Sequence, residues 1–232
     1  GSLYGAIIYQ KAPIMMRQLE RIVGADRFRE GIRVYLDRFR FSNATWLTLI
    51  EILDEMTETD LVAWSRAWVE APGRPIIRTE LETTNDGEFS GITLIQSGPD
   101  DDRSLQWNQQ IDVLIGRSGN IESVPIDLAG ERLDLAASDR PDFVLPNGSG
   151  LAYGDIVLDE GSRAYLLEYL GEFDDDLTRG AAWVTLWEEM LDGRILPQAL
   201  MDLALEAVRI EDTEQVVQLL LNGITSLYWR YL

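Results

Sequence analysis

The spacing of hydrophobic side chains changes twice along this chain of 232 residues. Residues 4–73 carry apolar side chains three and four positions apart, which is the repeat of a helix with one buried face. In residues 76–159, short apolar runs alternate with turn residues, and this pattern is typical of strands. The helical repeat returns in residues 160–232. The sequence therefore predicts helices, then strands, then helices.

Individual residues predict where the N-terminal helices begin and end. One helical face is formed by Phe28, Ile32, Tyr35, Leu36 and Phe39. Gly24 is expected to end the preceding helix, and Asp26 is expected to cap the helix that carries this face. Asn43 and Asp60 are expected to cap two further helices. Pro13 suits the first turn of the opening helix, where its missing N–H costs nothing.

Seven short apolar segments predict a small β-sandwich. They are Ile76–Thr83, Phe89–Gln96, Trp107–Ile115, Ile121–Ile126, Leu133–Ala136, Phe143–Leu145 and Tyr153–Leu158. Asn85–Gly87 and Arg117–Asn120 are turn sequences of the kind that joins the two strands of a hairpin. We expect the acidic run Asp100–Asp102 to form a solvated loop, because it lacks the glycine and the distal glutamate of a calcium-binding EF-hand loop.

The last part of the chain predicts amphipathic helices. Their apolar faces are formed by Trp183, Leu186, Trp187, Met190 and Leu191, and by Leu200, Leu203, Ala204, Ala207 and Val208. Pro197 suits the first turn of a helix. Asp212 and Gln215 are spaced like the two residues of a capping box, so a helix is expected to begin there.

The chain has three predicted units, at residues 1–75, 76–159 and 160–232, and they differ in charge. Residues 1–75 hold 10 basic and 10 acidic residues, whereas residues 76–232 hold 10 basic and 30 acidic residues. The net charge of −20 would repel phosphate backbones and anionic lipid. We therefore expect neither a nucleic-acid partner nor a membrane partner, and we expect a solvated acidic surface.

The chain contains no histidine and no cysteine. It therefore cannot form an H-E-x-x-H zinc site, a Cys/His zinc site, a nucleophile activated by histidine or a disulfide. No apolar run approaches the roughly 20 residues of a membrane-spanning helix.

Lys11 is the only lysine, and the 19 other basic residues are all arginine. It follows Tyr9 by two positions, at the entry to the first predicted helix. The segment Tyr9–Ala12 resembles the Tyr-x-Lys-Gly helix entry of zinc aminopeptidases of the aminopeptidase N family, with Ala12 in the place of the glycine. The resemblance continues in the same order through Leu19–Gly24, Phe28, Gly31, Tyr35–Leu36, Asn43–Ala44, Leu61, Trp68 and Gly73–Pro75.

This resemblance, which covers about a third of the chain, implies a fold and an activity. It implies the helical end of a gluzincin catalytic domain, a small β-sandwich, and the start of a superhelical, HEAT-like helical segment. The chain would then be part of an enzyme that removes N-terminal residues from peptides. Its zinc ligands would lie in an upstream domain, outside this chain. The resemblance implies that Tyr9 is catalytic, with a hydroxyl that supports the tetrahedral intermediate; it implies no chemical role for Lys11.

Two other interpretations remain open on the sequence. A homologue could keep this scaffold, lose the zinc site and serve as an interaction module. Alternatively, an unrelated binding protein could carry its function on the sandwich, for example toward carbohydrate or protein. The last interpretation predicts exposed aromatic side chains on one face of the sandwich, whereas the family resemblance predicts that Trp107 is buried between units.

Overall fold

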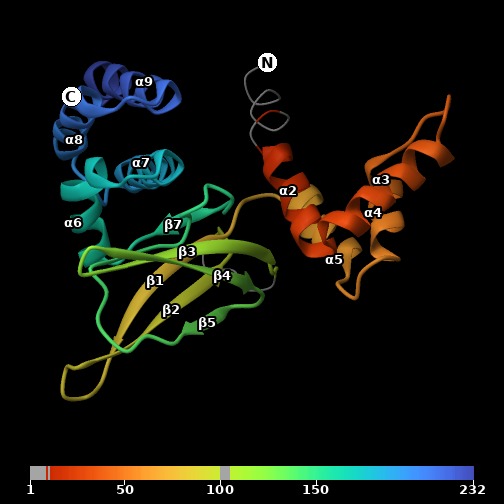
Figure 1. Ribbon diagram of the computed structural model, residues 1–232, viewed down its shortest axis with the longest axis horizontal. Coiled ribbons are helices and arrows are strands. Elements are labelled where there is room, and N and C mark those ends of the chain that lie inside the picture. The colour runs from red at the N-terminus through yellow and green to blue at the C-terminus, as the bar shows by residue number, and fades with distance from the viewer. Residues whose placement is uncertain (1–8, 10, 100–104) are drawn as a thin grey trace.

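The computed structural model describes residues 9, 11–99 and 105–232, and it is an elongated molecule (Figure 1). N-terminal helices lie at one end, two small sheets lie in the middle, and C-terminal helices lie at the other end. This order confirms the predicted sequence of helices, strands and helices. The predicted loop at Asp100–Asp102 lies outside the described residues.

The N-terminal helices form around one hydrophobic cluster. They are α2 (Ala12–Val23), α3 (Ala25–Arg38), α4 (Trp46–Asp54), α5 (Leu61–Ser65) and the π-helical turn η2 (Arg66–Glu70). Leu19, Ile50, Leu53, Leu61 and Trp68 are buried at its centre. Three residues of the predicted face, Phe28, Ile32 and Tyr35, pack against this cluster and are half-buried. Leu36 is exposed, and Phe39 lies just beyond the end of α3.

The predicted helix ends are confirmed in part. Gly24 ends α2 with a φ of 88°, a left-handed conformation that glycine adopts without a Cβ clash. Asp60 caps α5, as predicted. The prediction for Asp26 is wrong, because α3 begins directly after Gly24 and Asp26 already lies in its first turn. The prediction for Asn43 is also wrong, since Thr45 is extended and its hydroxyl caps α4.

The middle of the molecule consists of seven strands in two sheets. They are β1 (Ile76–Thr83), β2 (Phe89–Ser97), β3 (Gln109–Arg117), β4 (Asn120–Leu128), β5 (Arg132–Leu135), β6 (Phe143–Leu145) and β7 (Asp155–Val157). The first sheet has the order β5-β2-β1-β7 and the second has the order β4-β3-β6. Only the β1–β7 pair is parallel among these pairings.

Both predicted hairpins are confirmed. Gly87 and Gly119 supply the positive φ angles that the two turns require, 81° and 79°. The prediction that a strand begins at Trp107 is wrong. β3 begins at Gln109, and Trp107 lies in the preceding loop with its side chain buried.

The C-terminal helices share a hydrophobic cluster with both sheets. They are α6 (Glu160–Tyr169), the 3₁₀ turn η4 (Leu170–Glu172), α7 (Asp176–Leu191), α8 (Pro197–Ile210) and α9 (Glu214–Arg230). Pro197 and Pro13 occupy first helical turns, as predicted. The predicted capping box at Asp212 is wrong, because the N-cap of α9 is Thr213. The Thr213 side chain makes no capping hydrogen bond.

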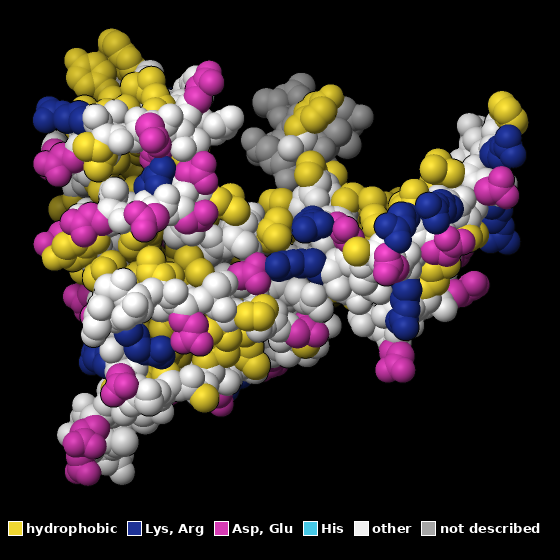
Figure 2. Space-filling view, in the orientation of Figure 1, with side chains coloured by type: hydrophobic (Ala, Val, Ile, Leu, Met, Phe, Trp, Pro, Cys, Tyr) yellow, Lys and Arg dark blue, Asp and Glu magenta, His cyan; other side chains and the backbone are white. Residues whose placement is uncertain are grey.

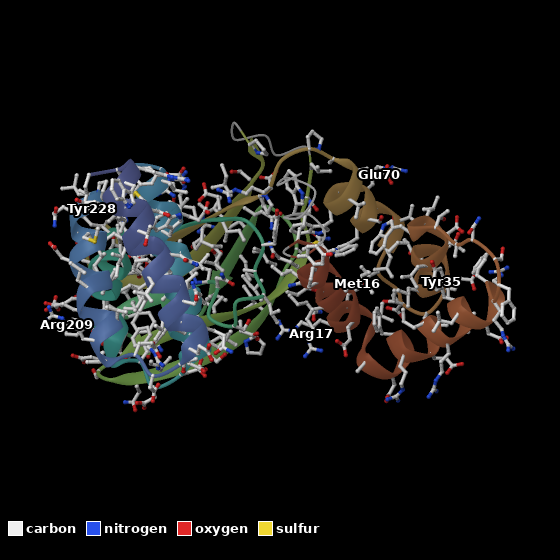
Figure 3. All side chains as sticks on the ribbon, turned by 90° about the horizontal axis from the view of Figure 1, so that it is seen from above. Met16, Arg17, Tyr35, Glu70, Arg209 and Tyr228 are labelled. Carbon is white, nitrogen blue, oxygen red and sulfur yellow. The ribbon has the colours of Figure 1, made fainter. Side chains whose placement is uncertain are left out.

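Figure 3 shows where the helices at the two ends lie relative to the sheets. Figure 3 marks α2 with Met16 and Arg17, between the sheets and the outer helix α3, which carries Tyr35. Arg209 and Tyr228 mark α8 and α9 at the opposite end. Within the described part of the chain, no helix is long and apolar enough to cross a membrane.

Added salt is expected to raise the midpoint of thermal unfolding. Figure 2 shows acidic side chains spread over the whole visible face, whereas basic side chains gather mainly over α2 and α3. Ions shorten the range of repulsion between carboxylates, from a Debye length of about 10 Å at 0.1 M to about 3 Å at 1 M. Calorimetry from low to molar sodium chloride tests this expectation, with choline chloride as a second salt. A flat or falling midpoint in both salts would contradict it.

Candidate site at the N-terminal end of α2

Tyr9 lies just ahead of α2 and is 80% exposed. Within the described part of the chain, its hydroxyl has no hydrogen-bond partner. Lys11 occupies the N-cap position of α2 and is half-buried. Its Nζ lies 5.4 Å from the centroid of the Tyr153 ring. Burial lowers the pKa of Lys11 from its usual value.

Gln18 and Arg21 fix α2 to strand β3. The buried Gln18 amide donates to the carbonyl of Gln110 at 2.9 Å and accepts from the N–H of Gln110 at 2.8 Å. Arg21 donates to the same carbonyl at 3.0 Å and to the carboxylate of Asp112 at 2.7 Å. These directional bonds set both the position and the rotation of the helix that follows Tyr9.

Two more buried glutamines pair with a peptide unit in the same way as Gln18. Gln96 donates to the carbonyl of Trp107 and accepts from its N–H, at 3.1 and 2.9 Å. Gln109 does the same with Tyr153, at 3.3 and 2.9 Å. Gln96 and Gln109 thereby supply hydrogen-bond partners to the backbone of a loop, where no neighbouring strand of the described structure supplies them.

Tryptophans join the N-terminal helices to the loop before β3. The indoles of Trp64 and Trp68 both donate to the carbonyl of Asn108, at 2.9 and 3.1 Å. In the opposite direction, the indole of Trp107 donates to the carbonyl of Ala67 at 3.1 Å. The burial of Trp107 between the helices and the sheets confirms the prediction from the family resemblance.

A hollow of about 680 Å³ separates the N-terminal end of α2 from helices α7 and α9. Figure 2 shows the open notch between these parts of the molecule. Ile14 and Tyr153 line the side near α2, and the far wall includes Asp176 and Glu188. Arg74, at the base, pairs with Glu188 at 2.7 Å. The hollow is therefore mostly apolar on both sides, because Leu177, Ala181 and Val184 also line the α7 side.

The residues present do not fit a zinc site of the aminopeptidase type. No histidine or cysteine occurs in the sequence, and the described residues contain no group of three or more acidic side chains placed to hold a metal ion. The sequence therefore lacks the family's histidine ligands, and the described residues offer no carboxylate cluster in their place.

Comparison with known sequences relates the chain to a family of proteins. Residues 1–68, which include Tyr9 and α2–α4, match the model of the Peptidase family M1 domain. The chain is a homologue of the aminopeptidase N family of M1 peptidases, and it corresponds to a part of them.

Individual relatives are similar in sequence over most of the chain. Aminopeptidase N of Streptomyces lividans is 29% identical over 229 residues, which are 93% of this chain and 27% of that protein. The puromycin-sensitive aminopeptidase of Caenorhabditis elegans is 28% identical over 181 residues, which are 75% of this chain and 17% of that protein. The chain thus spans about a quarter or less of the length of these two relatives.

A solved structure shares the fold. The crystal structure of Legionella pneumophila aminopeptidase A in complex with aspartic acid matches 99% of this chain and 31% of that chain. The TM-score is 0.53 and the sequence identity is 16%. This likeness concerns the arrangement of helices and sheets.

Sequence reasoning predicted a role for Tyr9 and missed the contacts that hold α2 in place. It assigned no role to Lys11 and did not single out the three glutamines. One signal was present for Gln18, which lies three residues after Met15 and one before Leu19, on the apolar face of α2. A polar residue on a buried face needs a partner, and here the partner is a strand backbone.

Proposed function

We propose that this chain is the portion that follows the zinc site in a zinc aminopeptidase, an enzyme that removes N-terminal residues from peptides. The observation that carries the proposal is the match of residues 1–68 to the M1 peptidase domain, together with an exposed Tyr9 hydroxyl without a partner in the described structure. The zinc ligands and the peptide-binding residues would come from a preceding domain of the same polypeptide.

Tyr9 is proposed to donate a hydrogen bond to the carbonyl oxygen of the scissile peptide bond. Negative charge develops on this oxygen when water attacks the carbonyl carbon, so the hydrogen bond strengthens as the transition state forms. Zinc would polarise the carbonyl and activate the water, but its ligands lie outside this chain. The contribution of the chain is a correctly placed donor and the scaffold that places it.

The architecture of the family supplies the finer description of the fold. Residues 1–75 are proposed to be the helical end of the catalytic domain, residues 76–159 a β-sandwich, and residues 160–232 the beginning of a superhelical domain. The paired sheets and the stacked helices α7, α8 and α9 support this proposal.

The 232-residue chain by itself is expected to bind no stoichiometric zinc and to hydrolyse no aminoacyl anilide. Carboxylates are the only hard metal ligands it offers in place of the family's histidines. Elemental analysis and an aminoacyl-anilide assay of the purified chain measure both. A longer polypeptide that adds the preceding domain serves as the positive control. One tightly held zinc per 232-residue chain would contradict the expectation.

The longer polypeptide also separates the proposal from its rivals. Zinc binding and turnover are expected if it is an aminopeptidase, whereas a homologue that serves as an interaction module would show neither. The structure offers less support for a binding protein that uses its sheets. The aromatic residues of the described strands are Phe89, which is half-buried, and Phe143, which is 1% exposed.

A further inference from the structure

Lys11 has an unusual position for a cation in an acidic protein. In a chain with a net charge of −20, the described structure places no carboxylate within 4.0 Å of its Nζ. Its charged group lies instead over the ring of Tyr153, at 5.4 Å from the centroid. A cation over the face of an aromatic ring is attracted by the negative charge of the π system.

Tyr153 is held both through its ring and through its backbone. The Trp68 ring meets the Tyr153 ring edge-on, with the centroids 6.1 Å apart. The backbone N–H and carbonyl of Tyr153 are both bound by the buried amide of Gln109. Tyr153 therefore contacts the helical core through its ring and the sheets through its backbone.

The other anchors of α2 in the described structure begin farther along the helix. Met15 is its first fully buried residue, and Gln18 and Arg21 supply the bonds to β3. Pro13 is exposed and has no N–H to donate. Among the described residues, the contact between Lys11 and Tyr153 is therefore the side-chain anchor that lies nearest to Tyr9 in sequence.

We propose that Lys11 is a positioning residue, which fixes the entry of α2 on the Tyr153 ring and thereby holds the hydroxyl of Tyr9 in place. This inference rests on the proposed function of Tyr9. Because the ring attracts the cation and no carboxylate competes within 4.0 Å among the described residues, the contact depends on the positive charge and on the aromatic face.

NMR of the 232-residue chain tests the contact without any catalysis. The only lysine gives one set of side-chain signals after lysine-selective isotope labelling, so no assignment is needed. The Hε protons of Lys11 are expected upfield of those in an unfolded peptide, because they lie over an aromatic ring. The shift should persist in Tyr153→Phe and disappear in Tyr153→Leu. Unfolded-peptide shifts in the native chain would overturn the contact.

Kinetics of the longer, zinc-bearing polypeptide test the positioning role. Lys11→Met is expected to lower kcat by a factor on the order of ten, and to leave KM and zinc content unchanged. This factor corresponds to the strength of a partly desolvated cation–π contact. Tyr153→Leu should have a similar effect, and the double variant should be no worse than the poorer single variant. Lys11→Arg should recover most of the loss, since arginine also stacks on aromatic rings. Arg17→Met is the matched control, because Arg17 is an exposed cation on α2 paired with Glu20.

The Tyr9→Phe background separates positioning from other roles. If Lys11 acts through the hydroxyl of Tyr9, Lys11→Met should reduce kcat no further in that background. An additional tenfold loss there, or an unchanged kcat in Lys11→Met, would overturn the positioning role. An inactive longer polypeptide, or a Tyr9→Phe enzyme with native kcat, would overturn the proposed function and with it the positioning role. The NMR result would still report independently whether the contact exists.

Discussion

Replacing Tyr9 by phenylalanine in the longer, zinc-bearing polypeptide is expected to lower kcat by a factor on the order of 10²–10³. The substitution removes one hydroxyl and keeps the ring, so the packing at the entry of α2 is preserved. The lost hydrogen bond forms mainly in the transition state, and kcat should therefore fall while KM changes little. Steady-state kinetics with an aminoacyl anilide measure the effect.

Tyr35→Phe is the matched control for this experiment. Tyr35 lies on α3, far from the entry of α2 in Figure 3, and it is half-buried. Native zinc content and an unchanged unfolding midpoint must accompany the kinetics of Tyr9→Phe. A raised KM with native kcat would assign Tyr9 to substrate binding in the ground state. Native values of both constants would reduce Tyr9 to part of the scaffold.

Periodicity predicted the elements of this fold because helices such as α2 and α8 and strands such as β1 bury one face. The seven strand segments and both hairpins follow from alternation and from glycines that supply positive φ. Helix starts were harder to predict. Asparagine and threonine both favour the N-cap, and Thr45 rather than Asn43 occupies the N-cap of α4. The N-cap of α3 is Gly24 and not Asp26. The preference of single residues for the N-cap does not decide which of two neighbouring residues occupies it. The backbone path of the preceding segment, which tertiary packing determines, also matters.

The candidate site was predictable only where local sequence specifies it. Tyr9 was found through a short sequence pattern at a helix entry, and its role remains a prediction. The contact of Lys11 with Tyr153 joins distant parts of the chain, so no local pattern could reveal it. The same is true of Gln18, whose partner lies on β3.

The two ends of the molecule are attached to the sheets by different interactions. Helices α6–α9 share a continuous apolar cluster with the strands. Helix α2 is held on β3 by hydrogen bonds from Gln18 and Arg21, in addition to the cluster around Trp107. Apolar contact is roughly proportional to buried area and has no preferred direction, whereas hydrogen bonds require a defined geometry. If Tyr9 has the proposed role, the directional type of contact suits the helix that positions its hydroxyl.

The buried carboxylate of Glu189 is the centre of the ionic network that joins α7 to the strands. Its side chain is fully buried and accepts hydrogen bonds from Arg163 and from Arg194, the latter at 2.7 Å. It also accepts from the N–H of Leu158 at 3.2 Å. Arg194 extends the network to Asp155 on β7, at 3.4 Å. Removing the negative charge would take away the buried carboxylate to which both guanidinium groups donate.

Glu189→Gln is therefore expected to lower the free energy of unfolding by about 3 kcal/mol, the size of effect seen when one partner of a buried ion pair is removed. The neighbouring residue offers a matched control. Glu188→Gln removes the same charge one position earlier, but Glu188 and its partner Arg74 have side chains that are 28% and 43% exposed. Such a pair contributes about 0–1 kcal/mol. Urea unfolding of the 232-residue chain measures both variants. Equal losses for the two glutamates would show that burial of Glu189 adds nothing to its role in stability.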